Sequence, residues 1–139
     1  MYKALTTIVL SILLASTAAS HAHNVQHPHS AQHADEVAYN MKKMKRAYRN
    51  ALRSDDIEQM KPAVAQLLAI SKNVATLDYG INRTEQADYR EGMQQLQAGL
   101  ALLNAAVEAN DFALAQKILR EQIKATRNQS HEKLGVDEY

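Results

Sequence analysis

Apolar residues recur at helical spacing along most of the chain. Steps of three and four residues, which place side chains on one face of an α-helix, run through four stretches: residues 34–53, 57–77, 84–108 and 111–134. The apolar positions are Val37, Met41, Met44, Tyr48 and Leu52; Ile57, Met60, Val64, Leu67, Val74 and Leu77; Tyr89, Met93, Leu96, Leu100, Leu103 and Val107; then Phe112, Ala115, Leu119 and Ile123.

Residues typical of helix ends separate these stretches. The sequence SDD at 54–56 supplies N-caps for the second helix, Thr84 is a candidate cap for the third, and Asp111 for the fourth. Gly135 is a natural stop for the last helix, and Pro62 either begins or kinks the second. Short loops make consecutive helices antiparallel neighbours, so we expect an all-α, up-down-up-down four-helix bundle over residues 34–139.

The N-terminal segment resembles a secretion signal. Residues 1–22 combine a short positive start, an apolar run and small residues at Ser20 and Ala22, which is typical of a signal peptide cleaved after Ala22. The apolar run is shorter than the roughly 20 residues of a spanning helix. We therefore expect export to the periplasm, with an uncleaved anchor as the alternative.

Residues 23–33 lack any apolar period and contain Pro28, so we expect a flexible tail. This segment is rich in histidine, which can bind Zn, Cu or Ni. Its histidines are His23, His27, His29 and His33. Pro28 interrupts a helical arrangement of these ligands, so the sequence favours weak metal binding over a defined site.

Composition excludes several classes of function. The chain has no cysteine, so an exported form has no disulfides and cannot attach haem through a CxxCH motif. The formal charge is +1, and it falls to 0 once Lys3 is removed with the signal, so no nucleic-acid surface is expected. No nucleophile-base pair or Gly-rich phosphate loop stands out, so we expect no enzyme. We expect a monomer with no membrane contact after cleavage.

His131 is the only histidine after His33, and it lies near the end of the last expected helix. In an up-down-up-down bundle this position shares one end with the start of the first helix, where Met41 lies. A thioether and an imidazole that face each other can be the two axial ligands of a haem iron. The alternatives are ordinary: methionine often fills a core, and histidine suits a helix C-terminus. Met44, Met60 and Met93 also lie on apolar faces.

Three sequence runs resemble the soluble cytochrome b-562 family. The run REQIKATRNQSHEKL at 120–134 is similar to that family's C-terminal helix, where E-Q-L-K-T-T-R-N-x-x-H ends in a haem-ligating histidine. The run YNMKKMKRAY at 39–48 resembles the first helix, in which Asn-Met supplies the second ligand. The run DYREGM at 88–93 resembles the D-F-R-x-G-F that begins helix 3. The spacing around the helix 3–4 turn differs from the family's by about a residue.

The resemblance implies one non-covalent haem b per chain, with Met41 and His131 as axial ligands. Both axial positions are then filled, which suits single-electron transfer with redox partner proteins that the sequence does not identify. Met44 falls where the family has an apolar wall residue. The alternative function is a haem-free periplasmic bundle that binds transition metal through its tail or acts as a chaperone.

Other residues are candidates for the wall of the haem pocket. Tyr89 and Met93 stand where the family has two aromatic residues, and Arg127, one turn before His131, either holds a propionate or is a surface arginine. Helix-interior glycine costs about 1 kcal/mol relative to alanine. Close approach of the macrocycle would explain Gly92, whereas Gly99 is explained by tight helix packing.

Overall fold

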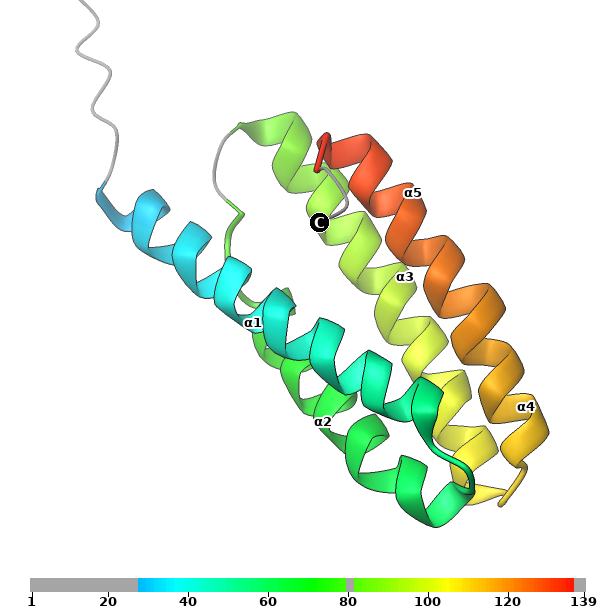
Figure 1. The fold of residues 1–139 in the computed structure, drawn as a ribbon. Coiled ribbons are helices and arrows are strands. Elements are labelled where there is room, and N and C mark those ends of the chain that lie inside the picture. The colour runs from blue at the N-terminus through cyan, green and yellow to red at the C-terminus, as the bar shows by residue number, and fades with distance from the viewer. Residues whose placement is uncertain (1–27, 80–81, 137–139) are drawn as a thin grey trace, which may run out of the picture.

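The computed structural model describes residues 28–79 and 82–136, the first six of them by their backbone alone. The expected bundle is confirmed: every element in these two ranges is helical, and the helices lie antiparallel (Figure 1). The fourth helix is continuous but is divided into α4, η1 and α5. In chain order the elements are α1 (Pro28–Arg53), α2 (Ile57–Ala75), α3 (Arg83–Glu108), α4 (Phe112–Lys117), η1 (Ile118–Ile123) and α5 (Lys124–Leu134).

Side-chain caps start three of the helices. Asp56 accepts a hydrogen bond from the Gln59 backbone N–H, and Asp111 accepts one from Leu114, as the sequence predicts. The expected cap of α3 at Thr84 is wrong: Asn82 is the cap, and its side chain accepts from the Glu85 N–H.

The last helix ends where the sequence predicts. Gly135 follows Leu134 and adopts the left-handed conformation, with φ 62°, that lets a helix close on its own last carbonyls. Pro62 does not begin a helix, since α2 starts at Ile57 and continues through it.

The start of α1 corrects the predicted tail. The helix begins at Pro28, so the backbone of residues 28–33 is helical rather than flexible. Proline is compatible with this position because its fixed φ suits the first turn and its missing N–H has no intrahelical partner there. The predicted signal segment and residues 23–27 lie outside the described residues.

The core lies along the centre of the bundle and draws on all four helices. Its largest fully buried side chains are Met60, Leu67, Leu100, Leu103, Leu119, Val64, Val74 and Ser71. Around it, α1 packs on α2, α2 on α3, and α3 on the whole fourth helix. The packing between α1 and the fourth helix is less extensive, because α1 contacts η1 but makes at most sparse contact with α5. Within the described residues, no helix is long and apolar enough to cross a membrane.

Candidate functional site

The two candidate methionines of α1 have different surroundings. Met44 is 7% exposed and belongs to the core, whereas Met41 is half-buried and packs against the core from its edge. They lie three residues apart, so both face the bundle but at different depths and heights. Asn40, beside Met41, is also buried, and its amide donates to the Glu36 carbonyl one turn earlier.

His131 lies on α5, at the end of the bundle that also holds the N-terminal half of α1 (Figure 1). Its side chain is half-buried, and its Nδ1 atom is buried. Contacts with α3 hold this part of α5 in place. Lys133 Nζ lies 2.9 Å from a Glu91 carboxylate oxygen, and this hydrogen bond raises the pKa of Lys133.

Gly92 lies beneath α5 rather than facing α1. A Cβ atom added there would come within 2.5 Å of the Ser130 hydroxyl oxygen, so the glycine lets α5 approach α3 closely. This packing accounts for the glycine without any cofactor. Gly99 has the role predicted for it, because an added Cβ would lie 2.8 Å from Ile123 Cδ1.

A π-helical segment lies between the fourth helix's start and His131. In η1 the backbone hydrogen bonds reach one residue further than in an α-helix, so this turn takes up one extra residue. The sequence predicts one regular helix here and misses this segment.

Tyr48 ties α1 to this π-helical segment. Its hydroxyl donates a hydrogen bond of 3.0 Å to the Leu119 carbonyl of η1. Burial raises the pKa of Tyr48, while the positive charges of Arg127 and Arg120 act to lower it. Both arginines therefore lie near enough to the Tyr48 hydroxyl for their charges to act on it. The Arg127 guanidinium also donates to the Asn128 side-chain oxygen at 2.9 Å and 3.2 Å.

Tyr89 and Met93 are buried on α3, at 3% and 5% exposure. The Tyr89 hydroxyl donates to the Val74 carbonyl of α2 at 2.7 Å, and its ring stacks on Tyr79 with 5.2 Å between centroids. Burial raises the pKa of Tyr89, followed in size by the effect of Tyr79. The phenol is therefore fixed toward α2.

The arrangement leaves the α1–α5 side of this end without close helix packing. Figure 1 shows the cyan part of α1 and the red part of α5 at the same end, diverging from each other. Met41 and His131 are both half-buried, whereas Met44, Tyr89 and Met93 are buried. A flat apolar cofactor between α1 and α5 would take the place of direct helix contact.

Known proteins were compared with this chain. The family model described as cytochrome b562 matches residues 36–134. The chain belongs to the cytochrome b562 family. A comparison with curated proteins finds no match.

Cytochrome b562 proteins are haem-binding electron carriers rather than typical enzymes, so membership of this family implies that the chain binds haem. The donor set fits this group, since a thioether and an imidazole are common axial ligands of haem iron in electron carriers. Among the residues that the structure describes, no group of three or more His, Cys, Asp or Glu is placed so that it could hold a metal ion. His23 and His27 of the predicted tail lie outside these residues, and the side chains of His29 and His33 are not described.

Proposed function

We propose that this protein is a periplasmic b-type cytochrome that carries single electrons through one non-covalently bound haem, with Met41 and His131 as axial ligands. The observation that carries the proposal is the placement of these two side chains. Both lie half-buried at the one end of a cytochrome b562 bundle where α1 and α5 do not pack closely. The proposed location rests on the signal-like residues 1–22.

The difference in burial between the two methionines favours Met41 over Met44 as the iron ligand. Met44 is 7% exposed and embedded in the core, so using its sulfur as a ligand would open a cavity there. Met41 lies at the core's edge, beside the poorly packed side of the bundle. Three residues of helix correspond to about 4.5 Å along the axis, too far for both sulfurs to serve one iron position.

With both axial positions filled, the bound haem supplies one-electron redox chemistry and leaves no open site for oxygen or substrate. The chain's residues hold and shield it. The contact of Lys133 with Glu91 and the close packing of Ser130 on Gly92 fix the part of α5 that carries His131. Because the chain has no cysteine, the haem would be held by ligation, packing and polar contacts alone.

Visible spectra of the oxidised and reduced protein test this function. The purified protein should bind haem one to one and give a low-spin spectrum in both states. His131→Ala should abolish the low-spin form. Met41→Leu should shift the haem toward high spin and lower its reduction potential, because the thioether ligand that raises the potential is lost.

Met44→Leu is the matched control for Met41→Leu. It nearly conserves volume, so it should cost less than about 1.5 kcal/mol and leave the spectrum unchanged. The reverse pattern would assign the ligand to Met44. An unchanged spectrum in His131→Ala would remove His131 from the iron. Sequencing the N-terminus of the exported protein tests the location, with His23 expected as the first residue.

A further inference from the structure

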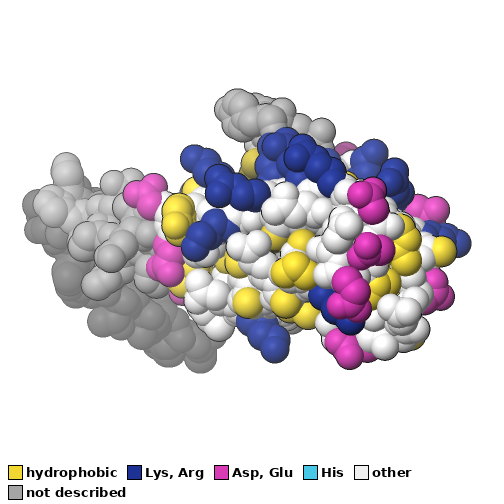
Figure 2. All heavy atoms as spheres, turned by 60° about the horizontal axis from the view of Figure 1, so that its bottom comes forward, with side chains coloured by type: hydrophobic (Ala, Val, Ile, Leu, Met, Phe, Trp, Pro, Cys, Tyr) yellow, Lys and Arg dark blue, Asp and Glu magenta, His cyan; other side chains and the backbone are white. Residues whose placement is uncertain are grey.

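Positive charge is concentrated on one segment of α1. Residues 42–53 hold six of the chain's sixteen Lys and Arg residues, and no Asp or Glu occurs between Glu36 and Asp55. The whole chain has a formal charge of only +1, so the rest of the sequence is net acidic. Figure 2 shows a row of Lys and Arg side chains along the upper edge of the face in view, and several Asp and Glu side chains toward its right-hand end with others at the left.

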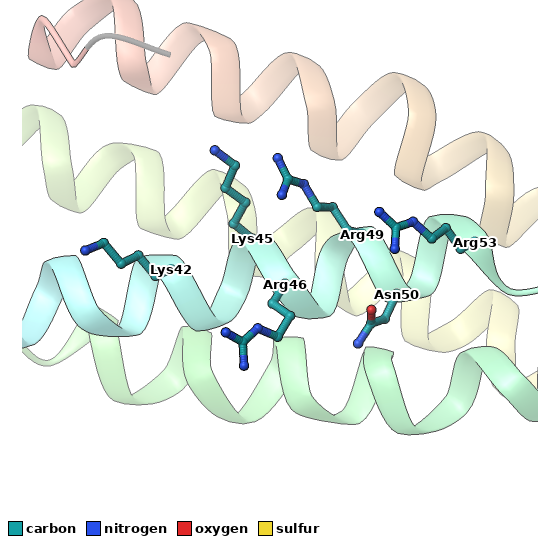
Figure 3. Close-up of a pocket in the computed structure, with 6 residues that line it drawn as sticks. All are labelled: Lys42, Lys45, Arg46, Arg49, Asn50 and Arg53. Carbon is teal, nitrogen blue, oxygen red and sulfur yellow. The ribbon is translucent and has the colours of Figure 1, made fainter. Parts of the chain in front are cut away.

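Five of these cations surround a hollow on α1. The hollow has a volume of about 270 Å³. In Figure 3, Lys45, Arg49 and Arg53 point toward the side of the fourth helix, whereas Arg46 and Asn50 point the other way, toward α2. We call the five cations the basic face. They are Lys42, Lys45, Arg46, Arg49 and Arg53, all of them exposed.

Packing of the bundle does not require the basic face. Like charges three and four residues apart on a helix repel each other and destabilise it. The ion pairs recorded for exposed lysines and arginines elsewhere include Lys61 with Glu58 and Arg90 with Asp78. Among the described residues, no carboxylate pairs with Lys42, Arg46, Arg49 or Arg53. A partner that brings carboxylates would relieve this repulsion.

The basic face also adjoins the haem site. Lys42 directly follows Met41 in the sequence, and the side chains that point toward the fourth helix approach the side from which Arg127 and Arg120 act on Tyr48. Positive charge therefore lies on both helices that flank the proposed haem. An electron carrier needs its partner to dock close to the cofactor, and charge of one sign around that place steers encounters.

We propose that the basic face of α1 is the docking surface for an acidic patch on a redox partner protein. This rests on the proposed function, because the partner exchanges its electron with the haem held between α1 and α5. Complexes of this kind bury little area and dissociate quickly, and electrostatic complementarity sets their association rate.

The surroundings of the basic face favour a protein partner over an anionic membrane. A helix that lies in a lipid interface presents a broad apolar face beside its cations. The apolar face of α1 is buried in the core, and the exposed large hydrophobic side chain on α1 is Tyr39, whose ring lies under Lys43 Nζ at 4.7 Å. The other exposed large hydrophobic side chains among the described residues are Leu102 on α3, Leu114 on α4 and Val136 just after α5.

The test uses the full haem-loaded protein and, as probe, an acidic flavodoxin whose one-electron exchange is followed by stopped flow. The second-order rate constant should fall at least about tenfold between low and high salt, as screening removes the steering. Arg46→Glu with Arg49→Glu should lower the low-salt rate constant at least about tenfold and remove most of its salt dependence. The control, Lys72→Glu with Arg83→Glu, changes the net charge equally on α2 and α3 and should stay within about twofold of the wild type.

Each other outcome has a defined meaning. A rate constant independent of salt, or an equal loss in both double variants, would overturn docking at this face. The proposal would also be overturned if Arg46→Glu with Arg49→Glu weakened binding to phosphatidylglycerol vesicles but left the rate constant with flavodoxin unchanged. Failure of the proposed function would be seen before this experiment, because the protein would then show no low-spin haem spectrum. Docking would then be judged by the salt-dependent binding of flavodoxin to the same variants in calorimetry.

Discussion

Deleting Glu121 should convert η1 into a regular α-helical turn and leave His131 on the face that it now occupies. His131 lies sixteen residues after the buried Ala115. Each residue of an α-helix turns the chain by about 100°, so in a regular helix His131 would lie about 160° around from Ala115, nearly on the opposite side. The π-helical turn takes up one residue and removes about 100° of this, which leaves about 60°.

The deletion reaches the same geometry by another route. After the deletion the histidine follows Ala115 by fifteen residues of regular α-helix, so the angle between the two around the helix axis is again about 60°. Glu121 is exposed, and the buried Leu119 and Ile123 would become neighbours three apart on one α-helical face. An alanine inserted after Glu121 is the matched opposite change. It would rotate His131 by about a further 100° and move it about 1.5 Å along the axis.

Haem-loaded spectra and far-ultraviolet circular dichroism decide the outcome. The deletion variant should keep its helix content and its low-spin spectrum, whereas the insertion variant should stay helical and lose the imidazole ligand. If the deletion variant is fully helical but high-spin, η1 is not a register correction. The same conclusion follows if the insertion variant binds haem normally.

Three further changes test the packing around the site. Burial raises the pKa of Tyr89 above its ordinary value of 10.0, so above pH 10 the folded state keeps a proton that the unfolded state releases. The free energy of unfolding should therefore be constant below pH 10 and fall above it by about 1.4 kcal/mol per pH unit. Tyr89→Phe should remove this fall from a series of urea-unfolding curves measured across that pH range. Tyr48→Phe removes the hydrogen bond to η1 and should lower the free energy of unfolding by about 0.5–1.5 kcal/mol in urea at pH 7, an effect that would be absent if this bond does not hold α1. Gly99→Ala gains helix propensity but places a Cβ 2.8 Å from Ile123 Cδ1. Ile123→Val removes that methyl group, so in the alanine background it should cost less than its usual value of about 0.5–1.5 kcal/mol, and additive effects in a double-mutant cycle would contradict this.

The bundle could be predicted from the sequence because two local signals agreed. The apolar period set the helices, and Asp56, Asp111 and Gly135 marked their ends. Where competing local signals were close in strength, tertiary structure chose between them. Asn82 rather than Thr84 caps α3, next to a turn in which the Tyr79 N–H donates to the Gln86 side-chain oxygen at 2.7 Å.

The site was predictable only in part. Pattern alone placed Met41 and Met44 on one face, and their difference in depth emerges only from packing against α2 and the core. The π-helical turn leaves no apolar period of its own in the sequence, and the hydrogen bond that its Leu119 carbonyl accepts comes from Tyr48 on another helix. The net charge of the chain did not reveal the basic face, because acidic residues elsewhere in the sequence cancel its positive charge. The signal that could have found it is the six cations at 42–53, with no acidic residue between Glu36 and Asp55.

The tight junctions between helices bear on how fast the chain folds. Residues 54–56 join α1 to α2, and residues 109–111 join α3 to α4, so each pair can close as a hairpin of neighbouring segments. Chains dominated by such local contacts fold in microseconds to milliseconds. We therefore expect the polypeptide to fold into its bundle before it binds haem. Haem binding, rather than folding, should then limit the rate at which a new molecule becomes able to transfer electrons.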